Sequence, residues 1–316
     1  MTKRKIILVG SGAVGNSFLY SAMNRGIASE YGIIDLNAKA VEGNVLDFED
    51  GIAASSYPFD VYKATYKDCK DADIVVITAG RPQQPGETRL NMVEGNAKIM
   101  KNIALEIKKS GFKGITVIAS NPVDILTLVY QKVTGFDHKK VIGSGTSLDS
   151  SRLTREISKR LNVAPQSIQA YVMGEHGDSS VSAFSAVTVG GQPLKYFEEQ
   201  GKIDKNEYPS IHEFVWKKAY EIIERKGATF YGIGANLANI CENIFRNTNK
   251  IMAIGAYLNG EYENEGVYTG VPAVIGIDGI KEIIELKISK TEQKQFNKSV
   301  DQLKKVYESI EQVIKE

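Results

Sequence analysis

Two short segments combine residue types that could move a proton beside a fixed charge. The run 174–179, Gly-Glu-His-Gly-Asp-Ser, contains His176, one of three histidines. A histidine between glycines is either an ordinary loop residue or an acid–base group that titrates near neutral pH. The run 147–152, Ser-Leu-Asp-Ser-Ser-Arg, places Asp149 three residues before Arg152. A helix there would put the carboxylate and the guanidinium on one face.

A third segment, residues 79–89, is predicted to be a loop that ends in Arg89. It follows a buried apolar stretch, and its proline and glycine content is typical of a loop. A loop that carries an arginine could close over a bound molecule and exclude water. Plainer alternatives stay open, because Asp149 could serve only the N-terminus of its helix and Arg152 could be a surface residue.

Residues 10–15, Gly-Ser-Gly-Ala-Val-Gly, predict a dinucleotide-binding turn. They close the apolar stretch 5–9 and open a helical pattern, and Asp35 follows 20 residues after Gly15. The first glycine would permit the tight turn, the second the approach of a pyrophosphate, and the third close packing of helix on strand. The helix N-terminus would supply unpaired N–H donors to the phosphates. Asp35 favours NAD over NADP, because its carboxylate can bind ribose hydroxyls and repels a 2′-phosphate.

Composition excludes several classes of protein. A chain of 316 residues with 42% hydrophobic and 24% charged residues is typical of a globular protein of about two domains. The net charge of +1 gives no reason to expect nucleic acid or an anionic membrane as a partner. Cys69 and Cys241 stand far apart without histidine neighbours, so we expect neither disulfides nor a metal site. No apolar stretch is long enough to span a bilayer and no signal peptide is recognisable, so we expect a cytoplasmic protein.

The positions of the apolar runs predict an α/β fold. In residues 1–143, strand patterns alternate with helical patterns, which is typical of a Rossmann-type, doubly wound parallel sheet. The expected strands are 5–9, 31–35, 74–79, 115–119 and 141–143, and the expected helices are 14–28, 38–50, 92–110 and 122–134. Residues 144–316 are expected to form a C-terminal α+β substrate domain. Its expected elements are a helix after Asp149, antiparallel strands at 168–173 and 181–189, a helical block at about 209–246, strands around Val267–Ile277 and a helix at about 290–314.

Polar and glycine residues follow the ends of four predicted strands. Gly10, Asp35, Gly80 and Asn121 each lie at or just past the end of such a strand. Ligands of doubly wound sheets bind at the carboxyl ends of the strands, so we expect these residues to share one crevice.

Together these motifs resemble the L-lactate dehydrogenases of the lactate/malate dehydrogenase family. The resemblance rests on the glycine turn, on Ser-Asn-Pro-Val-Asp at 120–124, on 147–152 and 174–179, and on Lys-Gly-Ala-Thr at 226–229. It covers essentially the whole chain. It implies that NADH reduces the ketone of pyruvate to L-lactate, reversibly, with the role of regenerating NAD in fermentative glycolysis.

The resemblance also implies a role for each polar residue of the site. His176 would donate and accept the proton, with Asp149 behind its ring to fix the tautomer and stabilise the imidazolium. Arg152 would bind the substrate carboxylate through two parallel N–H bonds, and Arg89 would polarise the ketone. Asn121 would contact substrate and nicotinamide, and Thr229 would line the side-chain pocket. The residues expected to border NAD are Gly10, Gly12, Ala13, Val14, Gly15, Asp35, Tyr66, Thr78, Ala79, Gly80, Arg81, Ser120, Asn121 and Ser144.

Gln83 favours pyruvate over oxaloacetate. By resemblance, this loop position holds glutamine in lactate dehydrogenases and arginine in malate dehydrogenases. A neutral amide could not offset the second carboxylate of oxaloacetate, and an unpaired buried carboxylate is costly. Arg81, two residues away, could turn inward and supply that charge, so a malate dehydrogenase or a broad L-2-hydroxy-acid dehydrogenase stays the alternative.

Two positions depart from the family members that fructose 1,6-bisphosphate activates. An arginine and a histidine of that effector site correspond to Thr154 and Gln169, neither of which is cationic. We therefore expect weak or absent activation, with Arg155 as a possible substitute. The family implies a homo-oligomer, with a tetramer favoured and a dimer possible.

Two further hypotheses are compatible with the glycine turn but fit the other motifs less well. An NAD-dependent glycosidase of the same fold would need a metal bound by cysteine and histidine, and no cysteine stands near His176. A non-catalytic NAD-binding protein would not need His176, Arg89 and Arg152 in their motifs.

Overall fold

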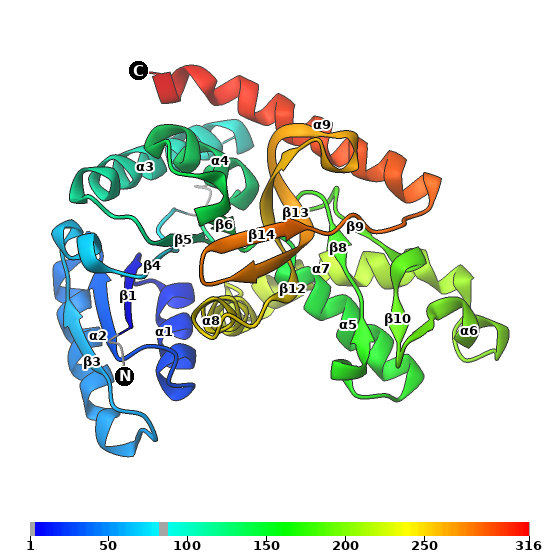
Figure 1. Cartoon of the computed structure of the whole chain (residues 1–316), viewed down its shortest axis with the longest axis horizontal. Coiled ribbons are helices and arrows are strands. Elements are labelled where there is room, and N and C mark those ends of the chain that lie inside the picture. Colours follow the sequence, from blue (N-terminus) through cyan, green and yellow to red (C-terminus); the bar gives the residue numbers. More distant parts are fainter. Residues whose placement is uncertain (1–3, 82–87, 316) are drawn as a thin grey trace.

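The core of the protein is a nine-stranded sheet with helices on both faces (Figure 1). The computed structural model describes residues 4–81 and 88–315, and for residues 89, 90, 313 and 315 it describes the backbone only. The strands follow the order β14-β13-β12-β6-β5-β4-β1-β2-β3. Their bounds are β1 Lys5–Val9, β2 Glu30–Ile34, β3 Asp60–Lys63, β4 Ile74–Ile77, β5 Ile115–Ile118, β6 Val141–Gly143, β12 Lys250–Asn259, β13 Glu265–Gly276 and β14 Gly279–Ile283.

Six of these strands are parallel, and they confirm the predicted doubly wound sheet. Neighbouring strands pair in register from β3 across β1 to β6, as between Ile7 and Gly32 on one side and Ile7 and Val75 on the other. The apolar runs of β1, β4 and β5 are buried along their whole length, because helices cover both faces. The sequence did not reveal the edge strand β3, since only Val61 of its four residues is buried.

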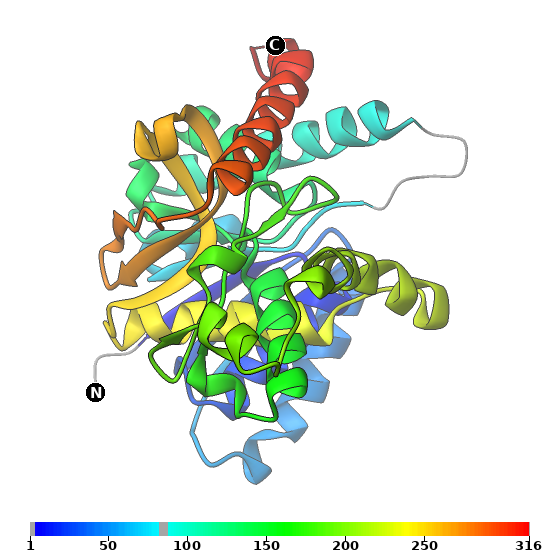
Figure 2. The same ribbon diagram turned by 90° about the vertical axis from the view of Figure 1, so that its right-hand side faces the viewer.

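Helices form two layers about the sheet. Those of the first half are α1 Ala13–Asn24, α2 Ala38–Asp50, α3 Arg89–Ser110 and α4 Val123–Thr134. The others are α5 Ser147–Leu161, α6 Leu194–Glu199, α7 Tyr208–Lys226, α8 Tyr231–Phe245 and α9 Lys290–Lys315. Helix α1 packs along α8, whereas α3, α4 and α9 pack against one another. Figures 1 and 2 show α9, in red, on the same side as α3 and α4.

The antiparallel strands β12–β14 extend the parallel sheet. β12 joins it beside β6 at a single antiparallel contact, Gly255 with Gly143. A Cβ atom on Gly255 would lie 2.9 Å from the Cα of Gly143, so the two backbones meet only because both residues are glycine. The sheet is therefore continuous between the two halves of the chain, which periodicity alone did not predict.

The rest of the second half forms a smaller core around α5 and α7. Its strands are short: β7 Ile168–Gln169, β10 Thr188–Val189 and β11 Gln192–Pro193 form one sheet, and β8 Val172–Met173 pairs with β9 Val181–Ser182. The predicted strands 168–173 and 181–189 are thus each divided in two. The predicted helical block 209–246 is also divided, because Gly227 ends α7 in the left-handed conformation.

Helix α9 closes the fold at the C-terminus, as its apolar stripe predicts. Its residues Phe296, Val300, Leu303 and Ile310 are buried. No helix in the described part of the chain is long and apolar enough to cross a membrane.

Candidate active site

The glycine turn has the three properties that its sequence predicts. Gly10 has a φ of +105°, and a Cβ there would lie 2.4 Å from the backbone nitrogen of Ala79. A Cβ on Gly15 would lie 2.1 Å from the carbonyl oxygen of Gly10, so the helix packs directly on the turn. Gly12 faces open space, with no heavy atom within 4 Å of a Cβ placed on it.

Helix α1 begins at this turn without a capping side chain. Gly12 is its N-cap, and no side-chain hydrogen bond satisfies the first N–H groups of the helix. Uncapped donors that face open space are suited to bind an anion. The turn therefore fits the pyrophosphate of a dinucleotide.

Asp35 lies beside the turn, at the end of β2. Its Oδ2 accepts the N–H of Ser11 at 2.7 Å, and its Oδ1 accepts the N–H of Asn37 at 2.9 Å. These two bonds fix the carboxylate at the mouth of the turn, where it can bind the hydroxyls of an adenosine ribose.

The other residues expected around NAD lie at the neighbouring strand ends. Thr78 donates from Oγ1 to the carbonyl of Gly10 at 2.7 Å, and Ser120 donates from Oγ to the carbonyl of Ala79 at 2.5 Å. Gly80, Asn121 and Ser144 follow β4, β5 and β6, Tyr66 begins a short 3₁₀ helix, and Ala13 and Val14 open α1. Gly10, Asp35, Gly80 and Asn121 therefore follow four adjacent strands, β1, β2, β4 and β5, at one edge of the sheet.

Asn96 of α3 also contacts this edge of the sheet, although the sequence did not single it out. Its Oδ1 accepts the N–H of Arg81 at 2.9 Å, and its Nδ2 donates to the carbonyls of Arg81 and Asn121, both at 3.1 Å. One buried amide thus joins two strand ends. The guanidinium of Arg81 lies against Gly95, where a Cβ would be 2.4 Å from its Nη2.

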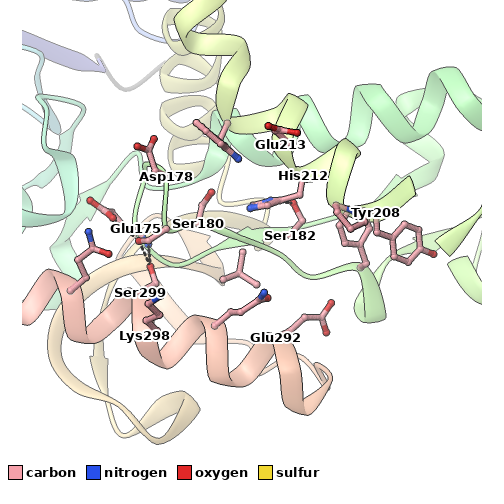
Figure 3. Close-up of a pocket in the computed structure, with 17 residues that line it drawn as sticks. Glu175, Asp178, Ser180, Ser182, Tyr208, His212, Glu213, Glu292, Lys298 and Ser299 are labelled. Carbon is pink, nitrogen blue, oxygen red and sulfur yellow. Dashed lines mark hydrogen bonds between the residues drawn. The ribbon is translucent and has the colours of Figure 1, made fainter. Parts of the chain in front are cut away.

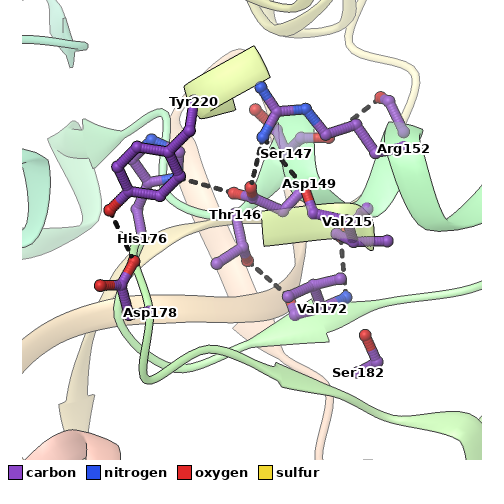
Figure 4. A network of polar contacts seen from close by, with 12 residues as sticks. Thr146, Ser147, Asp149, Arg152, Val172, His176, Asp178, Ser182, Val215 and Tyr220 are labelled. Atoms are coloured by element: carbon purple, nitrogen blue, oxygen red, sulfur yellow. Dashed lines mark hydrogen bonds and ion pairs between the residues drawn. The ribbon is translucent and has the colours of Figure 1, made fainter. Parts of the chain in front are cut away.

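His176 and Asp149 form a close pair (Figure 4). The Nδ1 atom of His176 lies 2.6 Å from Oδ2 of Asp149. The aspartate side chain is 6% exposed and that of the histidine is 26% exposed. The negative charge of Asp149 outweighs burial, and with the hydrogen bond it raises the pKa of His176 to about 9. Burial acts to raise the pKa of Asp149, but the charges of His176 and Arg152 and the bond to His176 lower it.

Arg152 contacts the second oxygen of the same carboxylate. Its Nη1 lies 3.2 Å from Oδ1 of Asp149, and it also donates to the carbonyl of Val215 at 3.3 Å. Spacing of three residues on α5 predicts this shared face. Within the described residues, this guanidinium donates both of these hydrogen bonds from Nη1. Its Nη2 and Nε groups can therefore bind a substrate carboxylate.

Three further residues surround His176, and the sequence had assigned no role to any of them. Two are acids and one is a tyrosine. Asp124 accepts the backbone N–H of His176 at 2.8 Å. The hydroxyl of Tyr220, on α7, donates at 3.0 Å to Asp178, two residues after His176 (Figure 4). Asp124 and Asp178 stand inside the motifs, which was a usable signal, whereas nothing in the sequence marks Tyr220.

For the three other residues expected to bind the substrate, the structure gives less detail than for Asn121 and Arg152. Gln83 lies outside the described residues. Arg89 is the first residue of α3, and its side chain is outside the description. Thr229 lies in the link between α7 and α8 and is half-buried.

A cavity of about 740 Å³ lies beside the loop of residues 174–179, which carries His176 (Figure 3). It is lined by Glu175 and Ser179 of that loop, by His212 and Trp216 of α7 and by Ser299 of α9. Of the expected substrate residues that the structure describes with side chains, namely Asn121, Arg152 and Thr229, none lines it, so we do not assign the substrate to it. Among the described residues no group of three metal-ligating side chains occurs.

Comparison with known proteins places the chain in a family. Residues 4–143 match the NAD-binding domain of lactate/malate dehydrogenases, and residues 146–314 match their α/β C-terminal domain. The chain belongs to the lactate/malate dehydrogenase family. The chain therefore carries the family's NAD-binding domain, and the glycine turn and Asp35 lie within it.

Similar proteins cover the whole chain. The L-lactate dehydrogenase of Mesoplasma florum is 53% identical over 99% of each chain, and that of Mycoplasma capricolum subsp. capricolum is 55% identical over 98% of each. The crystal structure of the minor L-lactate dehydrogenase from Enterococcus mundtii in its ligands-bound form is 43% identical, with a TM-score of 0.96 over 98% of this chain and 99% of that one. The ligands-unbound form of that protein has a TM-score of 0.91.

Proposed function

We propose that this protein is an NAD-dependent L-lactate dehydrogenase that reduces pyruvate to L-lactate reversibly. The observation that carries the proposal is the shared carboxylate of Asp149, which contacts His176 through one oxygen and Arg152 through the other. A proton donor and a carboxylate-binding cation are thereby held together by one buried acid. The named L-lactate dehydrogenases that resemble the whole chain support the same activity.

The chain's residues divide the work of the reaction. NAD fits the glycine turn and, when bound in reduced form, supplies the hydride. His176, with a pKa raised to about 9, is protonated at neutral pH and can give its Nε2 proton to the oxygen of the reduced ketone. The charge of Asp149 stabilises the imidazolium before that transfer and keeps Nδ1 protonated after it.

The remaining roles concern binding of the substrate. Arg152 binds the carboxylate of pyruvate, and Arg89 at the start of α3 stabilises the negative charge that develops on the ketone oxygen. Asn121 contacts substrate and nicotinamide, and Thr229 lines the pocket for the methyl group.

Gln83 sets the preference for pyruvate in this proposal. The structure supports this view indirectly, because the guanidinium of Arg81 packs on Gly95 of α3. Arg81 is therefore engaged on the helix, whereas a malate dehydrogenase would need a cation for the second carboxylate. A malate or broad L-2-hydroxy-acid dehydrogenase is the second candidate.

The proposal extends to organisation and assembly. We divide the chain into an NAD-binding domain, residues 1–143, and a substrate domain, residues 144–316. We propose a homo-oligomer, with a tetramer favoured over a dimer, supported by the exposed apolar side chains Tyr20, Leu46 and Tyr57 beside α1 and α2. A cytoplasmic location, where glycolysis supplies pyruvate and NADH, is part of the same proposal.

Activation by fructose 1,6-bisphosphate is proposed to be weak or absent. Gln169 lies at the exposed end of β7 and Thr154 is on α5, so neither position offers a cation to a phosphate. A several-fold fall in the KM for pyruvate at millimolar effector would contradict this.

The decisive experiment compares three substrates. NADH oxidation is followed with pyruvate, oxaloacetate and 2-oxoisocaproate at matched concentrations. We expect kcat/KM for pyruvate to lead by about a hundredfold, or roughly 2.7 kcal/mol. Oxaloacetate in the lead would make the chain a malate dehydrogenase, and equal rates with 2-oxoisocaproate would make it a broad 2-hydroxy-acid dehydrogenase.

A further inference from the structure

The segment that carries His176 is held by side chains from two different helices. We name residues 174–179 the histidine loop. On one side, Oδ2 of Asp124, on α4, accepts the N–H of His176 at 2.8 Å. On the other side, Oγ of Ser299, on α9, accepts the N–H of Glu175 at 2.8 Å, as drawn in Figure 3. Two consecutive backbone N–H groups of the loop are thus bonded to buried side chains rather than to a strand.

Asp124 is a buried acid among apolar residues, which is unusual for a helix position. It is 4% exposed on a helix whose neighbouring residues are apolar. Within the described residues, its Oδ1 has no hydrogen-bond partner, so the bond to His176 is the contact that explains a buried acid there. Burial is the main cause that raises its pKa to about 7, with the nearby Glu175 and Asp149 adding to the effect and His176 opposing it.

The bond from Asp124 completes a two-point attachment of the histidine. The ring is fixed at Nδ1 by Asp149, 2.6 Å away, and the backbone is fixed at N by Asp124. Without the bond to Asp124, the backbone of the loop could move by rotation at its glycines while the ring of His176 stayed bonded to Asp149. A displacement of about 1 Å at a reacting group costs on the order of a hundredfold in rate.

We propose that Asp124 is a positioning residue, which holds the backbone of His176 so that the imidazole points at the substrate. The proposal rests on the proposed function, because it assumes that His176 is the proton donor. Ser299 holds the adjoining residue of the loop, and its own hydroxyl also lies 2.9 Å from that of Ser179.

The test compares three substitutions in the full-length protein. D124L has the shape of aspartate without an acceptor, D124A removes the acceptor without adding bulk, and D124N keeps an oxygen that can accept the same N–H. T127V is the matched control, because Thr127 is a fully buried polar residue one turn further on α4 that bonds only to the carbonyl of Val123 in the described structure.

The kinetic result separates positioning from general damage. In D124L and D124A, kcat for pyruvate should fall by on the order of a hundredfold while the Kd for NADH stays unchanged. D124N should retain kcat within about threefold, since the hydrogen bond survives. T127V should match the parent. Equal losses in D124N and D124L, or full kcat in D124L, would overturn the proposal.

A second readout does not depend on activity. The chain has three histidines, so the imidazole Cε1–H signals can be assigned one by one in a protein labelled with ¹³C-histidine. The signal of His176 should move in D124L and D124A, and those of His138 and His212 should not. An unmoved His176 signal refutes the positioning role even if pyruvate proves not to be the substrate. Inactive parent protein with a shifted signal would instead refute the proposed function alone.

Discussion

At the scale of single residues, the site depends on one buried carboxylate. Asp149 faces His176 and Arg152 with different oxygens, so its charge acts on both the proposed proton donor and the proposed substrate-binding cation. Charge pairs in such a buried place act strongly because little solvent screens them. A substitution of Asp149 should therefore change both the pKa of His176 and the affinity for the substrate.

The first prediction concerns pH. Reduction of pyruvate needs protonated His176, so kcat/KM should be constant below pH about 9 and fall above it, whereas oxidation of L-lactate should rise up to that pH. Replacing Asp149 with Asn removes the charge that raises the pKa, so the reduction profile should shift to lower pH and lose on the order of a hundredfold or more at neutral pH. D137N is the control, since Asp137 lies 3.8 Å from another, exposed histidine, His138. An unshifted profile in D149N would sink this assignment.

The second prediction contrasts two glycines of the turn. Gly12→Ala should leave Tm almost unchanged, because the new Cβ meets open space and the backbone (φ −82°) suits alanine, but it should weaken NADH binding if a pyrophosphate lies there. Gly15→Ala should destabilise the protein by about 1–3 kcal/mol or more, because its Cβ would meet the carbonyl of Gly10. Fluorescence titration with NADH and thermal unfolding measure the two effects. Unchanged NADH affinity in the Gly12 variant would remove the pyrophosphate from this position.

The third prediction tests charge counting at the substrate. Gln83→Arg should supply the cation that oxaloacetate needs, so the ratio of kcat/KM for oxaloacetate over pyruvate should rise by several powers of ten, in line with the several kcal/mol of a buried charge pair. Gln84→Arg, one residue away in the same loop, is the control for added charge alone. If preference stays with pyruvate in the first variant, position 83 does not face the substrate.

At the scale of elements, α9 connects parts of the site that lie far apart in sequence. It packs against α3, which begins at Arg89, and against α4, which carries Asp124, and its Ser299 bonds to the histidine loop. The buried apolar stripe of α9 is what holds these contacts in place.

The fourth prediction concerns that stripe. Phe296 is fully buried, with its ring centroid 5.1 Å from that of Tyr262. Phe296→Ala should lower the free energy of unfolding by about 3–5 kcal/mol, because it removes packing and leaves a cavity. Lys305→Ala, at an exposed position of the same helix, should have little effect. Urea unfolding measures both, and similar values for the two variants would mean that the helix contributes little to the core.

At the scale of the whole molecule, exposed apolar residues gather beside α1 and α2. Tyr20 is 66% exposed, and it borders a groove of about 210 Å³ with Phe48 and Phe59. Leu46 and Tyr57 are also exposed nearby. An exposed apolar group of this kind is typical of an interface between subunits.

The fifth prediction follows for assembly. Tyr20→Glu should reduce the molar mass measured by light scattering, because a charge would be buried in the contact. Tyr196→Glu, which changes an exposed tyrosine on α6, should leave the assembly intact. If the parent is a monomer of 34.7 kDa, or if both variants dissociate alike, the groove is not the subunit interface.

Much of the fold could be predicted because its signals are local. Runs such as β1 and β4 are apolar throughout since both faces are covered, and the glycine turn needs residues without a side chain at fixed spacing. The edge strand β3 gave no such signal. The end of helix α7 at Gly227 also lies inside a long helical pattern, so the sequence pattern did not show it.

The sequence by itself determined the type of chemistry, through motifs whose members lie within a few residues of one another. The pairing of Asp149 with Arg152 follows from helix spacing alone. Only the tertiary structure decided which distant residues meet them. Asp124 reaches His176 across 52 positions, and Ser299 reaches Glu175 across 124. Periodicity describes how a segment presents its own faces, whereas these contacts depend on how separate helices pack on one sheet.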